Sequence, residues 1–258
     1  MKAISDSQSR VRHRWVYAPA AARPEALSVP VLEHVIRPRK RTPLPVLDSP
    51  ELRRRLNVLV AIAGIILAIP LMIIIALAIK LTSPGPVIFK QKRVGVDRRT
   101  PGLPSGNWRR TVDYGGRLFT LYKFRTMRSD SGNVQVWASP DDPRVTGVGA
   151  VLRKYRLDEL PQLFNVLKGD MNVVGPRPEQ PAIFAELRSE IDRYPVRQRV
   201  LPGITGWAQV NNSYDTSLDS VRRKLELDLQ YLERESTLED LRIMALTVPT
   251  VLGAKGAW

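Results

Sequence analysis

The fold is decided by residues 56–79, which read LNVLVAIAGIILAIPLMIIIALAI. This run contains no charged residue, and Asn57 is its one clearly polar side chain. A helix of this length and composition is long enough to cross the hydrocarbon core of a bilayer. Pro70 lies near the middle, where it removes a backbone donor and clashes with the preceding turn, so we expect a bend or a break there. The run therefore predicts a membrane-associated protein with a bent apolar helix.

Positive charge lies on both sides of the apolar run. Arginines occupy residues 53–55 before it, and after it come Lys80, Lys90, Lys92 and Arg93. Such charges are normally kept on the cytoplasmic side of a membrane. A re-entrant helix, which enters and leaves the bilayer on one face, satisfies both flanks at once. A bent helix that crosses the bilayer is the competing interpretation, because proline kinks are tolerated in membranes, and the residues alone leave both open.

The composition narrows the chemistry available to the chain. Its 258 residues include no cysteine, which excludes a thiolate nucleophile, a disulfide framework and a zinc–sulfur site. The two histidines are His13 and His34, so a catalytic apparatus further along the chain must use carboxylates, lysine, arginine or hydroxyl groups. The net charge of +15 suits nucleic acid, anionic lipid or phosphorylated small molecules. The apolar run favours the membrane, and because no nucleic-acid motif is present we expect no nucleic-acid partner.

The rest of the chain predicts a tail followed by one domain. Residues 1–50 contain seven prolines among scattered arginines and show no helical or strand period, so we expect a disordered basic tail. Residues 51–258 are then the folded, membrane-associated domain. Short apolar stretches near residues 87–89 and 118–122 predict strands, and helices are expected over residues 147–168, 179–192 and 217–234. These elements predict an α/β fold with a small sheet.

The last expected helix begins at a capping box. Ser236 and Glu239 have the spacing in which the two side chains satisfy free backbone N–H groups of a first helical turn. Apolar residues continue to Val251, so this segment is either an interfacial helix lying on the membrane or a helix packed on the core. Residues 98–115 are rich in arginine, glycine and proline and predict a surface loop.

The most informative stretch is residues 153–179. It places two adjacent carboxylates, Asp158 and Glu159, in the segment RKYRLDELPQLFN and ends in GPRPE at residues 175–179. Adjacent carboxylates repel one another unless a divalent cation or a nearby arginine keeps both ionised. The local pattern alone predicts that Asp158 is a helix N-cap with Pro161 in the first turn. Such a helix N-terminus also favours a bound phosphate.

Two further motifs carry positive charge. Arg177 lies between Pro176 and Pro178, which restrict the backbone and let the planar guanidinium face phosphate oxygens; the alternative is a rigid turn with a surface arginine. Lys123 and Arg125 alternate with aromatic residues, so on a strand the two cations share one face and the aromatics pack inward. They are suited to neutralising phosphate charge, with a solvated strand face as the alternative.

In these blocks the chain resembles the bacterial sugar transferase family, the monotopic phosphoglycosyltransferases. Five blocks match in order: the apolar run with its proline, YKFRTM at 122–127, LDELPQL at 157–163, GPRPE at 175–179 and PGITGWAQVN at 202–211. The resemblance covers the chain from residue 51 to its end. It implies an α/β monotopic membrane protein with an N-terminal re-entrant helix hairpin at residues 56–79, a small sheet and interfacial amphipathic helices.

The resemblance also implies an activity and a site. The activity is transfer of a sugar 1-phosphate from a UDP-sugar to undecaprenyl phosphate with release of UMP, as the initiating step of exopolysaccharide, O-antigen or other glycoconjugate assembly. Asp158 is implied as the nucleophile that forms a covalent phosphosugar intermediate, Glu159 as its partner, both as ligands of Mg²⁺, and Pro70 as the membrane hinge. The implied substrate-binding residues are Lys123, Arg125, Arg153, Pro176, Arg177 and Glu179.

The implied partners are a UDP-sugar donor, undecaprenyl phosphate and membrane lipids, and a homodimer is left open. The implied localisation is the bacterial inner membrane, with the catalytic domain on the cytoplasmic face. Two features depart from the family pattern: an insertion near residues 98–115, and an Ile69-Pro70 step where the family often has Ser-Pro. The insertion and the basic tail motivate an alternative function, a catalytically inactive membrane scaffold or regulator with the same fold.

Overall fold

A computed structural model describes residues 49–98, 115–128, 142–211 and 218–253, which all lie in one compact unit, Pro43–Trp258. The tail expected over residues 1–50 falls outside the described residues except for its last two. All but the two end residues of the loop expected over residues 98–115 also fall outside them.

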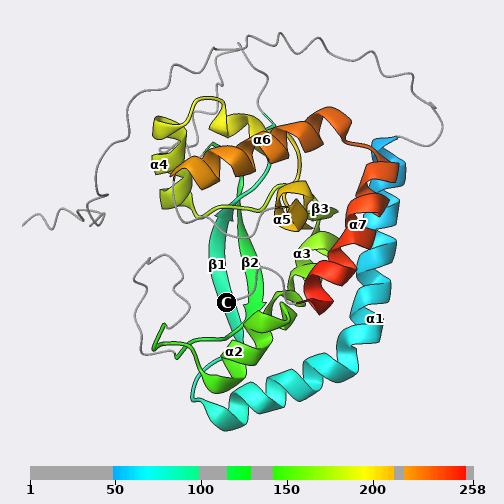
Figure 1. The fold of residues 1–258 in the computed structure, drawn as a ribbon. Coiled ribbons are helices and arrows are strands. Elements are labelled where there is room, and N and C mark those ends of the chain that lie inside the picture. The colour runs from blue at the N-terminus through cyan, green and yellow to red at the C-terminus, as the bar shows by residue number, and fades with distance from the viewer. Residues whose placement is uncertain (1–48, 99–114, 129–141, 212–217, 254–258) are drawn as a thin grey trace, which may run out of the picture. The chain divides into compact units, whose positions relative to one another are not determined.

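Helix α1 (Pro50–Thr82) contains the whole apolar run. Ser49 begins it, because the serine hydroxyl accepts a hydrogen bond from Leu52 N at 3.1 Å, and a proline is tolerated in the first turn, where its missing N–H has no intrahelical acceptor. Figure 1 shows that α1 is bent, as expected for a helix with Pro70 inside it. The chain forms one continuous bent helix here.

The apolar side chains of α1 are largely exposed in the protein alone. Leu67 and Leu81 are 81% and 84% exposed, and the buried residues of the helix are few. By length and composition α1 is able to cross a membrane, and it is the one such helix in the described part of the chain. A large exposed apolar surface marks a site of contact with lipid or with another apolar partner. Helix α1 is therefore compatible with monotopic membrane association.

Two small sheets accompany this helix. Strand β1 (Ile88–Val94) pairs antiparallel with β2 (Leu118–Phe124) along their whole lengths. Strand β3 (Asn172–Val174) pairs in parallel with β4 (Gly203–Thr205). The two strands predicted from the apolar stretches are confirmed as β1 and β2. The fold is a mixed, helix-rich α/β fold with small sheets, as the sequence predicted.

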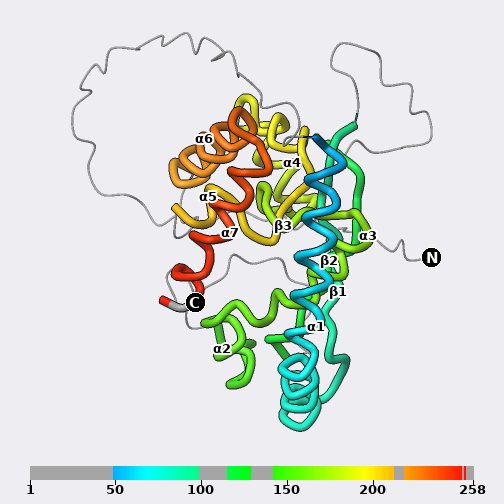
Figure 2. The backbone as a smooth tube through the Cα atoms, turned by 90° about the vertical axis from the view of Figure 1, so that its right-hand side faces the viewer, coloured from blue at the N-terminus to red at the C-terminus, as the bar shows by residue number. Residues whose placement is uncertain are grey.

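Short helices connect and cover these strands. They are α2 (Gly147–Lys154), the 3-10 helix η1 (Leu157–Glu159), α3 (Gln162–Lys168), α4 (Pro181–Glu190), the 3-10 helix η2 (Tyr194–Arg199), α5 (Trp207–Asn211), α6 (Leu218–Arg234) and α7 (Thr237–Leu252). Figures 1 and 2 place α4 and α6 near the end where α1 begins, and α2 near the end where α1 finishes. The helices expected over residues 179–192 and 217–234 are confirmed as α4 and α6. The N-cap half of the capping box is confirmed at α7, because Ser236 Oγ accepts from Glu239 N at 3.2 Å.

The single helix expected over residues 147–168 was wrong, because the chain is divided there into α2, η1 and α3. Arg156 has a φ of 53°, in the left-handed region that residues with long side chains rarely adopt, and it separates α2 from η1. Pro161 then precedes α3. The division places η1, which carries Asp158 and Glu159, at a corner between two helices.

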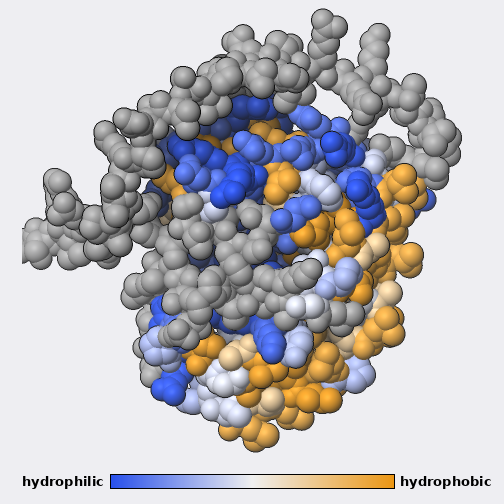
Figure 3. Space-filling model, viewed as in Figure 1, coloured by the Kyte–Doolittle hydropathy of each residue, from blue (hydrophilic) through white to orange (hydrophobic). Residues whose placement is uncertain are grey.

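Helix α1 contributes to the core with both of its halves. One cluster joins its first half to β2, α3, α6 and α7. The buried residues of this cluster are Ala61, Phe119, Leu121, Val166, Met171, Val173, Val174, Tyr231 and Ile243. Another joins its second half to β2 and α2 through Ile75, Ile79, Phe124 and Leu152. Figure 3 shows apolar residues gathered along the side formed by α1 and at the lower end, and hydrophilic residues gathered at the upper end. The domain thus presents an apolar side and a polar end.

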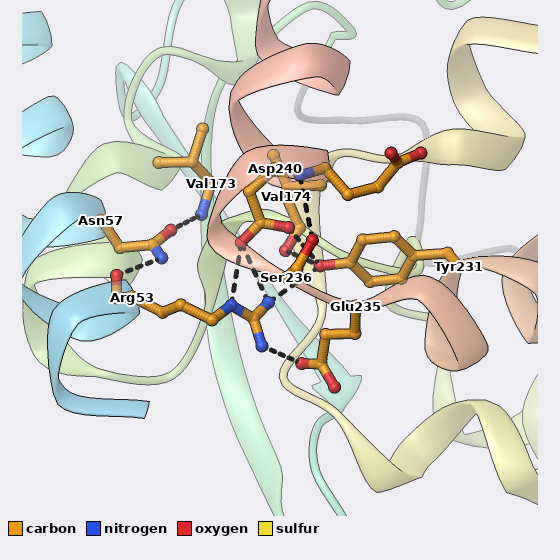
Figure 4. Close-up of polar contacts among 9 residues, drawn as sticks. Arg53, Asn57, Val173, Val174, Tyr231, Glu235, Ser236 and Asp240 are labelled. Atoms are coloured by element: carbon orange, nitrogen blue, oxygen red, sulfur yellow. Dashed lines mark hydrogen bonds and ion pairs between the residues drawn. The ribbon is translucent and has the colours of Figure 1, made fainter. Parts of the chain in front are cut away.

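The arginines before the apolar run are used within the protein. Arg53 binds side chains of α6, of α7 and of the link between them (Figure 4): Tyr231, Glu235 and Asp240. Arg54 donates to two carbonyls in the last turn of α3, Val166 O at 2.7 Å and Leu167 O at 3.0 Å. Of the three arginines, Arg55 is the exposed one. The positive charge on this flank that can interact with a membrane surface is therefore smaller than the sequence suggests.

Candidate active site

The two carboxylates of the candidate site lie together on η1. Asp158 and Glu159 are each 7% exposed, and Lys123 of β2 approaches both. The expectation that Asp158 caps a helix was wrong, because Pro161 is the residue that precedes α3 and Asp158 lies inside η1. The Asp158 carboxylate is thereby left to the site and is not used to satisfy a helix end.

Glu159 binds two cations. Arg177 donates from Nη2 to Glu159 Oε1 at 2.8 Å and from Nη1 to Oε2 at 3.4 Å, and Lys123 Nζ lies 3.0 Å from Oε1. Burial by itself would raise the pKa of Glu159, but Arg177 and Lys123 outweigh it and hold that pKa well below its usual range. Glu159 is therefore ionised at neutral pH.

Asp158 is compensated less well than its neighbour. Lys123 Nζ lies 3.5 Å from Asp158 Oδ2 and makes the one hydrogen bond that this carboxylate accepts from the residues the structure covers. Burial raises the pKa of Asp158, and the charge of Lys123 opposes that rise. A carboxylate with a raised pKa is more basic and hence a better nucleophile. Within the described residues Asp158 Oδ1 accepts no hydrogen bond, whereas both oxygens of Glu159 do.

Asn165 fixes Lys123 relative to η1. The Asn165 side chain is fully buried on α3, where it accepts from Tyr122 N at 3.1 Å and donates to Thr120 O at 2.7 Å. These two bonds attach β2 to the helix that follows η1, so the strand cannot slide past the carboxylates. Asn165 was not predicted as a site residue; the signal for it in the sequence is a polar residue among the apolar residues of a short helix.

Arg177 belongs to a turn after β3 that Pro176 and Glu179 support. Pro176 O accepts a hydrogen bond at 3.0 Å from the first residue of β4. Glu179 lies half-buried behind the turn, where its Oε1 lies 3.3 Å from Arg197 Nη1 and 3.3 Å from Lys224 Nζ. Pro176 and Glu179, both expected to bind substrate, are therefore bound by other protein groups in this structure.

Arg125 binds the turn that follows α1. It lies just after β2 and donates to Ser83 O at 2.8 Å and to Pro84 O at 2.5 Å. Lys123, two residues earlier, reaches η1 instead. The two cations of this motif are thus used in different places, and Arg125 connects the end of α1 to the sheet.

Arg153 lies on α2, within electrostatic range of the carboxylates. Its Nε donates to Thr126 Oγ1 at 3.0 Å. Burial lowers the pKa of Arg153, and the charge of Asp158 opposes that change. Of the predicted site residues, the structure brings four into direct contact: Asp158, Glu159, Lys123 and Arg177.

A small pocket adjoins this cluster. It is lined by Arg93, Leu121, Lys123, Gln162, Arg177 and Pro178. The polar part of the lining consists of three cations and one amide, which suits an anion such as phosphate. Gln162 Nε2 and Arg93 Nε are buried without a hydrogen-bond partner in the part of the chain that the structure covers. Neither residue was predicted as a site residue, although Gln162 lies inside the LDELPQL block.

The carboxylates fit a magnesium ion in combination with a phosphorylated ligand. The described residues contain no group of three or more histidine, cysteine or acidic side chains that could hold a metal. Mg²⁺ is commonly bound by one or two carboxylates together with substrate phosphates and water. Asp158, with its unused lone pairs, and Glu159 beside it match that set of ligands, and the cationic pocket is suited to the phosphates.

Comparison with known proteins relates this site to a family. The family model described as "Bacterial sugar transferase" matches residues 49–254. The chain is 43% identical to the UDP-N-acetylgalactosamine-undecaprenyl-phosphate N-acetylgalactosaminephosphotransferase of Aeromonas hydrophila, over 80% of this chain and 45% of that protein. It is 39% identical to the UDP-glucose:undecaprenyl-phosphate glucose-1-phosphate transferase of Escherichia coli (strain K12), over 80% of this chain and 42% of that protein.

A shorter relative is matched over more of its length. The UDP-glucose:undecaprenyl-phosphate glucose-1-phosphate transferase of Caulobacter vibrioides is 38% identical, over 84% of this chain and 75% of that protein. The chain thus spans less than half the length of the Aeromonas and E. coli relatives. The match to the family model, by contrast, covers most of the chain and includes η1, the turn of Arg177 and the whole of α1. The chain therefore belongs to the bacterial sugar transferase family.

Proposed function

We propose that this protein transfers a sugar 1-phosphate from a UDP-sugar to undecaprenyl phosphate and releases UMP. The names of the Aeromonas, E. coli and Caulobacter relatives all combine a UDP-sugar, undecaprenyl phosphate and transfer of a sugar phosphate. The observation that carries the proposal is the cluster of the buried Asp158 and Glu159 with the half-buried Lys123 and Arg177. A carboxylate beside cations supports the proposal, because phosphoryl transfer through a carboxylate needs both.

The proposed reaction consists of two displacements at one phosphorus atom. A carboxylate oxygen of Asp158 attacks the sugar-proximal phosphorus of the donor. The bond from that phosphorus to the bridging oxygen breaks, and UMP leaves with the oxygen and its electron pair, so an acyl phosphate joins Asp158 to the sugar phosphate. A phosphate oxygen of undecaprenyl phosphate then attacks the same phosphorus, and Asp158 leaves as a carboxylate. The product is a sugar diphosphate lipid, the starting unit for exopolysaccharide, O-antigen or other glycoconjugate assembly.

The cations of the site are placed to stabilise the departing UMP. Arg177 and Lys123 both lie against Glu159, next to the nucleophile, and can bind diphosphate oxygens as negative charge develops on them. Glu159 keeps these two cations in place before a donor binds. Mg²⁺ bound by Asp158 and Glu159 together with the diphosphate would supply further charge neutralisation.

The proposal includes a re-entrant path for α1 into the cytoplasmic leaflet of the bacterial inner membrane. Both ends of α1 are bound to the same domain, because Arg54 near its start donates to α3 and Arg125 binds the turn after its end. A bent apolar helix that is fixed at both ends to one domain can enter and leave on one face. The carboxylates would then meet a lipid-held acceptor at the surface where a soluble UDP-sugar arrives.

Release of UMP tests the proposed reaction. The full chain in nanodiscs with undecaprenyl phosphate and Mg²⁺ is supplied with UDP-glucose or UDP-N-acetylgalactosamine. We expect UMP from at least one donor, and a phosphosugar adduct in intact-mass spectra when the lipid acceptor is omitted. Asp158→Asn should lose both signals, with turnover reduced about a thousandfold or more. Asp219→Asn, at an 80% exposed aspartate of α6, is the matched control and should behave as wild type.

Three outcomes bear on separate parts of the proposal. Full activity in Asp158→Asn would overturn the assignment of the nucleophile. UMP release that is unaffected by EDTA would remove the role of magnesium. A folded protein that released no UMP from either donor would favour the alternative of a catalytically inactive scaffold with the same fold.

A further inference from the structure

We propose that Arg197 of η2 is a positioning residue, which holds the backbone of Arg177 so that the Arg177 side chain meets Glu159 and the diphosphate of the donor. The inference rests on the proposed function, in which Arg177 binds that diphosphate. Arg197 Nη2 donates to Arg177 O at 3.0 Å. Arg197 itself is 2% exposed, so any effect on a substrate passes through the groups that it contacts, and of these Arg177 lines the pocket.

The turn that carries Arg177 depends on donors from elsewhere in the fold. Pro176 and Pro178 have no backbone N–H, so the turn cannot form a continuous ladder of hydrogen bonds with a neighbouring strand. Its four successive carbonyls, at residues 176–179, are each bound by a donor from β4, η2 or β1. In chain order the donors are Gly203 N at 3.0 Å, Arg197 Nη2 at 3.0 Å, Arg93 Nη1 at 3.0 Å and Val94 N at 2.9 Å.

Arg197 reaches the turn from a buried polar cluster. Its Nη2 lies 2.7 Å from Asp228 Oδ2, and its Nη1 lies 3.3 Å from Glu179 Oε1. Nη1 also donates to Tyr194 Oη at 2.7 Å, and the guanidinium carbon lies 5.1 Å from the centre of the Tyr194 ring. The two terminal nitrogens and one face of the guanidinium are therefore bound, which orients Nη2 toward Arg177 O.

Stability alone does not account for this arrangement. A buried ion pair is commonly no more stabilising than well-packed apolar residues of the same volume. Apolar residues, however, could not direct an N–H group at the carbonyl of Arg177. A line of contacts runs from Asp228 to Arg197 at 2.7 Å, to Arg177 O at 3.0 Å, and from the Arg177 side chain to Glu159 at 2.8 Å. The buried cluster is thus connected to Arg177 through the Arg177 carbonyl, and it also contacts the same turn through Glu179 Oε1.

The planar fork of arginine is needed because the contacts of Arg197 diverge. One terminal nitrogen binds Tyr194 and Glu179, and the other binds Asp228 and Arg177 O. Lysine keeps the charge but has a single nitrogen, which cannot serve both sets of partners. Arg197→Lys therefore preserves the charge balance of the cluster while weakening the contact with Arg177 O.

The first test is a double-mutant cycle between Arg197 and Arg177. UMP release is measured in nanodiscs, with undecaprenyl phosphate and UDP-glucose or UDP-N-acetylgalactosamine, for the wild type, Arg197→Lys, Arg177→Ala and the double variant. Arg197→Lys should lower kcat/KM about tenfold or more in the wild type, the size expected for one hydrogen bond from a charged group. In the Arg177→Ala background the further loss should be less than about threefold, because the side chain that Arg197 positions is gone.

Arg222→Lys, at an exposed arginine of α6, is the matched control and should change nothing in either background. Equal losses from Arg197→Lys in both backgrounds would overturn the inference, since Arg197 would then act independently of Arg177.

A second test does not depend on activity. Gly175 N bonds to Thr205 O at 2.9 Å, so hydrogen–deuterium exchange over residues 174–180 reports how firmly the turn is bound. In Arg197→Lys the exchange rate of the turn should rise about tenfold or more, because loss of the hydrogen bond to Arg177 O lets the turn open more often. Helices α1 and α7 should exchange at wild-type rates. An unchanged rate at the turn, or an equal rise throughout the domain, would overturn the inference. If Arg197→Lys fails to fold, Tyr194→Phe removes one partner of Arg197 and should give the same local pattern at smaller size.

The two tests separate this inference from the proposed function. If neither donor yields UMP, the proposed function fails, and the exchange at residues 174–180 alone decides the role of Arg197. If UMP is released and the cycle is additive, the proposed function stands and the positioning role of Arg197 falls.

Discussion

Asn57 Oδ1 accepts a hydrogen bond from Val173 N at 2.5 Å, which attaches the one clearly polar residue of the apolar run to strand β3 (Figure 4). Asn57 Nδ2 donates to Arg53 O, one helical turn earlier, at 2.8 Å. Strand β3 leads directly into the turn that carries Arg177. Helix α1 and this part of the candidate site are therefore attached to the same strand.

Replacing Asn57 with leucine should destabilise the domain, even though it makes α1 more apolar. The change leaves the buried N–H of Val173 without its acceptor, at a cost of about 1–3 kcal/mol. Urea unfolding of the purified protein in detergent measures the loss. Asn211→Leu is the matched control, because Asn211 is exposed and bonds to Trp207 O one turn back in α5. A wild-type unfolding midpoint for Asn57→Leu would show that the bond is unimportant.

The pH dependence of turnover should report the ionisation of Asp158. Burial raises the pKa of this carboxyl above the ordinary 3.8, and Lys123 opposes the rise. Because the nucleophile must be ionised, kcat/KM should fall as the pH drops through the raised pKa. Lys123→Met removes the opposing charge and should move this acid limb to higher pH as well as lower the rate. Lys168→Met, at a half-exposed lysine beside Tyr122, should leave the limb in place; a limb that moved to lower pH in Lys123→Met would contradict the prediction.

Glu179 should make the protein lose stability in acid. Burial alone would raise the pKa of Glu179, but Lys224, Arg197 and Arg93 lower it from 4.5 to about 2. Because the folded-state pKa is the lower one, the ionised carboxylate stabilises the fold by about 3 kcal/mol above pH 4.5, and this contribution is lost as the pH falls toward 2.

Urea unfolding of the wild type and Glu179→Gln, at pH 7 and pH 3, measures this contribution. The difference between the two proteins should be large at pH 7 and smaller at pH 3. The comparison separates Glu179 from Asp228. Burial raises the pKa of Asp228, so its effect on the pH dependence of stability has the opposite sign. Parallel pH profiles for the two proteins would contradict the lowered pKa of Glu179.

The lack of native cysteine allows the path of α1 to be tested by labelling. Single cysteines in place of Glu51 and Lys80, exposed residues near the two ends of α1, are treated with a membrane-impermeant maleimide in sealed vesicles. If α1 is re-entrant, both cysteines should react from the same side of the membrane as a third cysteine, in place of Asp219, which reports the side on which the domain lies. Labelling of Glu51→Cys and Lys80→Cys from opposite sides would show that α1 crosses the bilayer.

Structural features that depend only on residues close together in the chain were predictable from the sequence. The apolar helix, the bend at its internal proline and the N-cap at Ser236 were all found where they were expected, because each depends on residues within a few positions along the chain. The continuous helix over residues 147–168 was wrong for a related reason. Its apolar spacing favours a helix, but Arg156 adopts a left-handed φ that local preferences disfavour and that the surrounding fold imposes.

The sequence by itself determined which chemical groups the protein has: an apolar helix with a proline, paired carboxylates without histidine or cysteine nearby, and an excess of cations. The tertiary structure alone decided which of these groups meet. Lys123 and Glu159 are 36 residues apart, and Arg53 and Asp240 are 187 residues apart. Pairing over such separations depends on how helices and strands pack against one another, which no local pattern specifies. For this reason the sequence predicts that Arg53 is a charge flanking the membrane, whereas in the fold Arg53 forms an internal ion pair with Asp240.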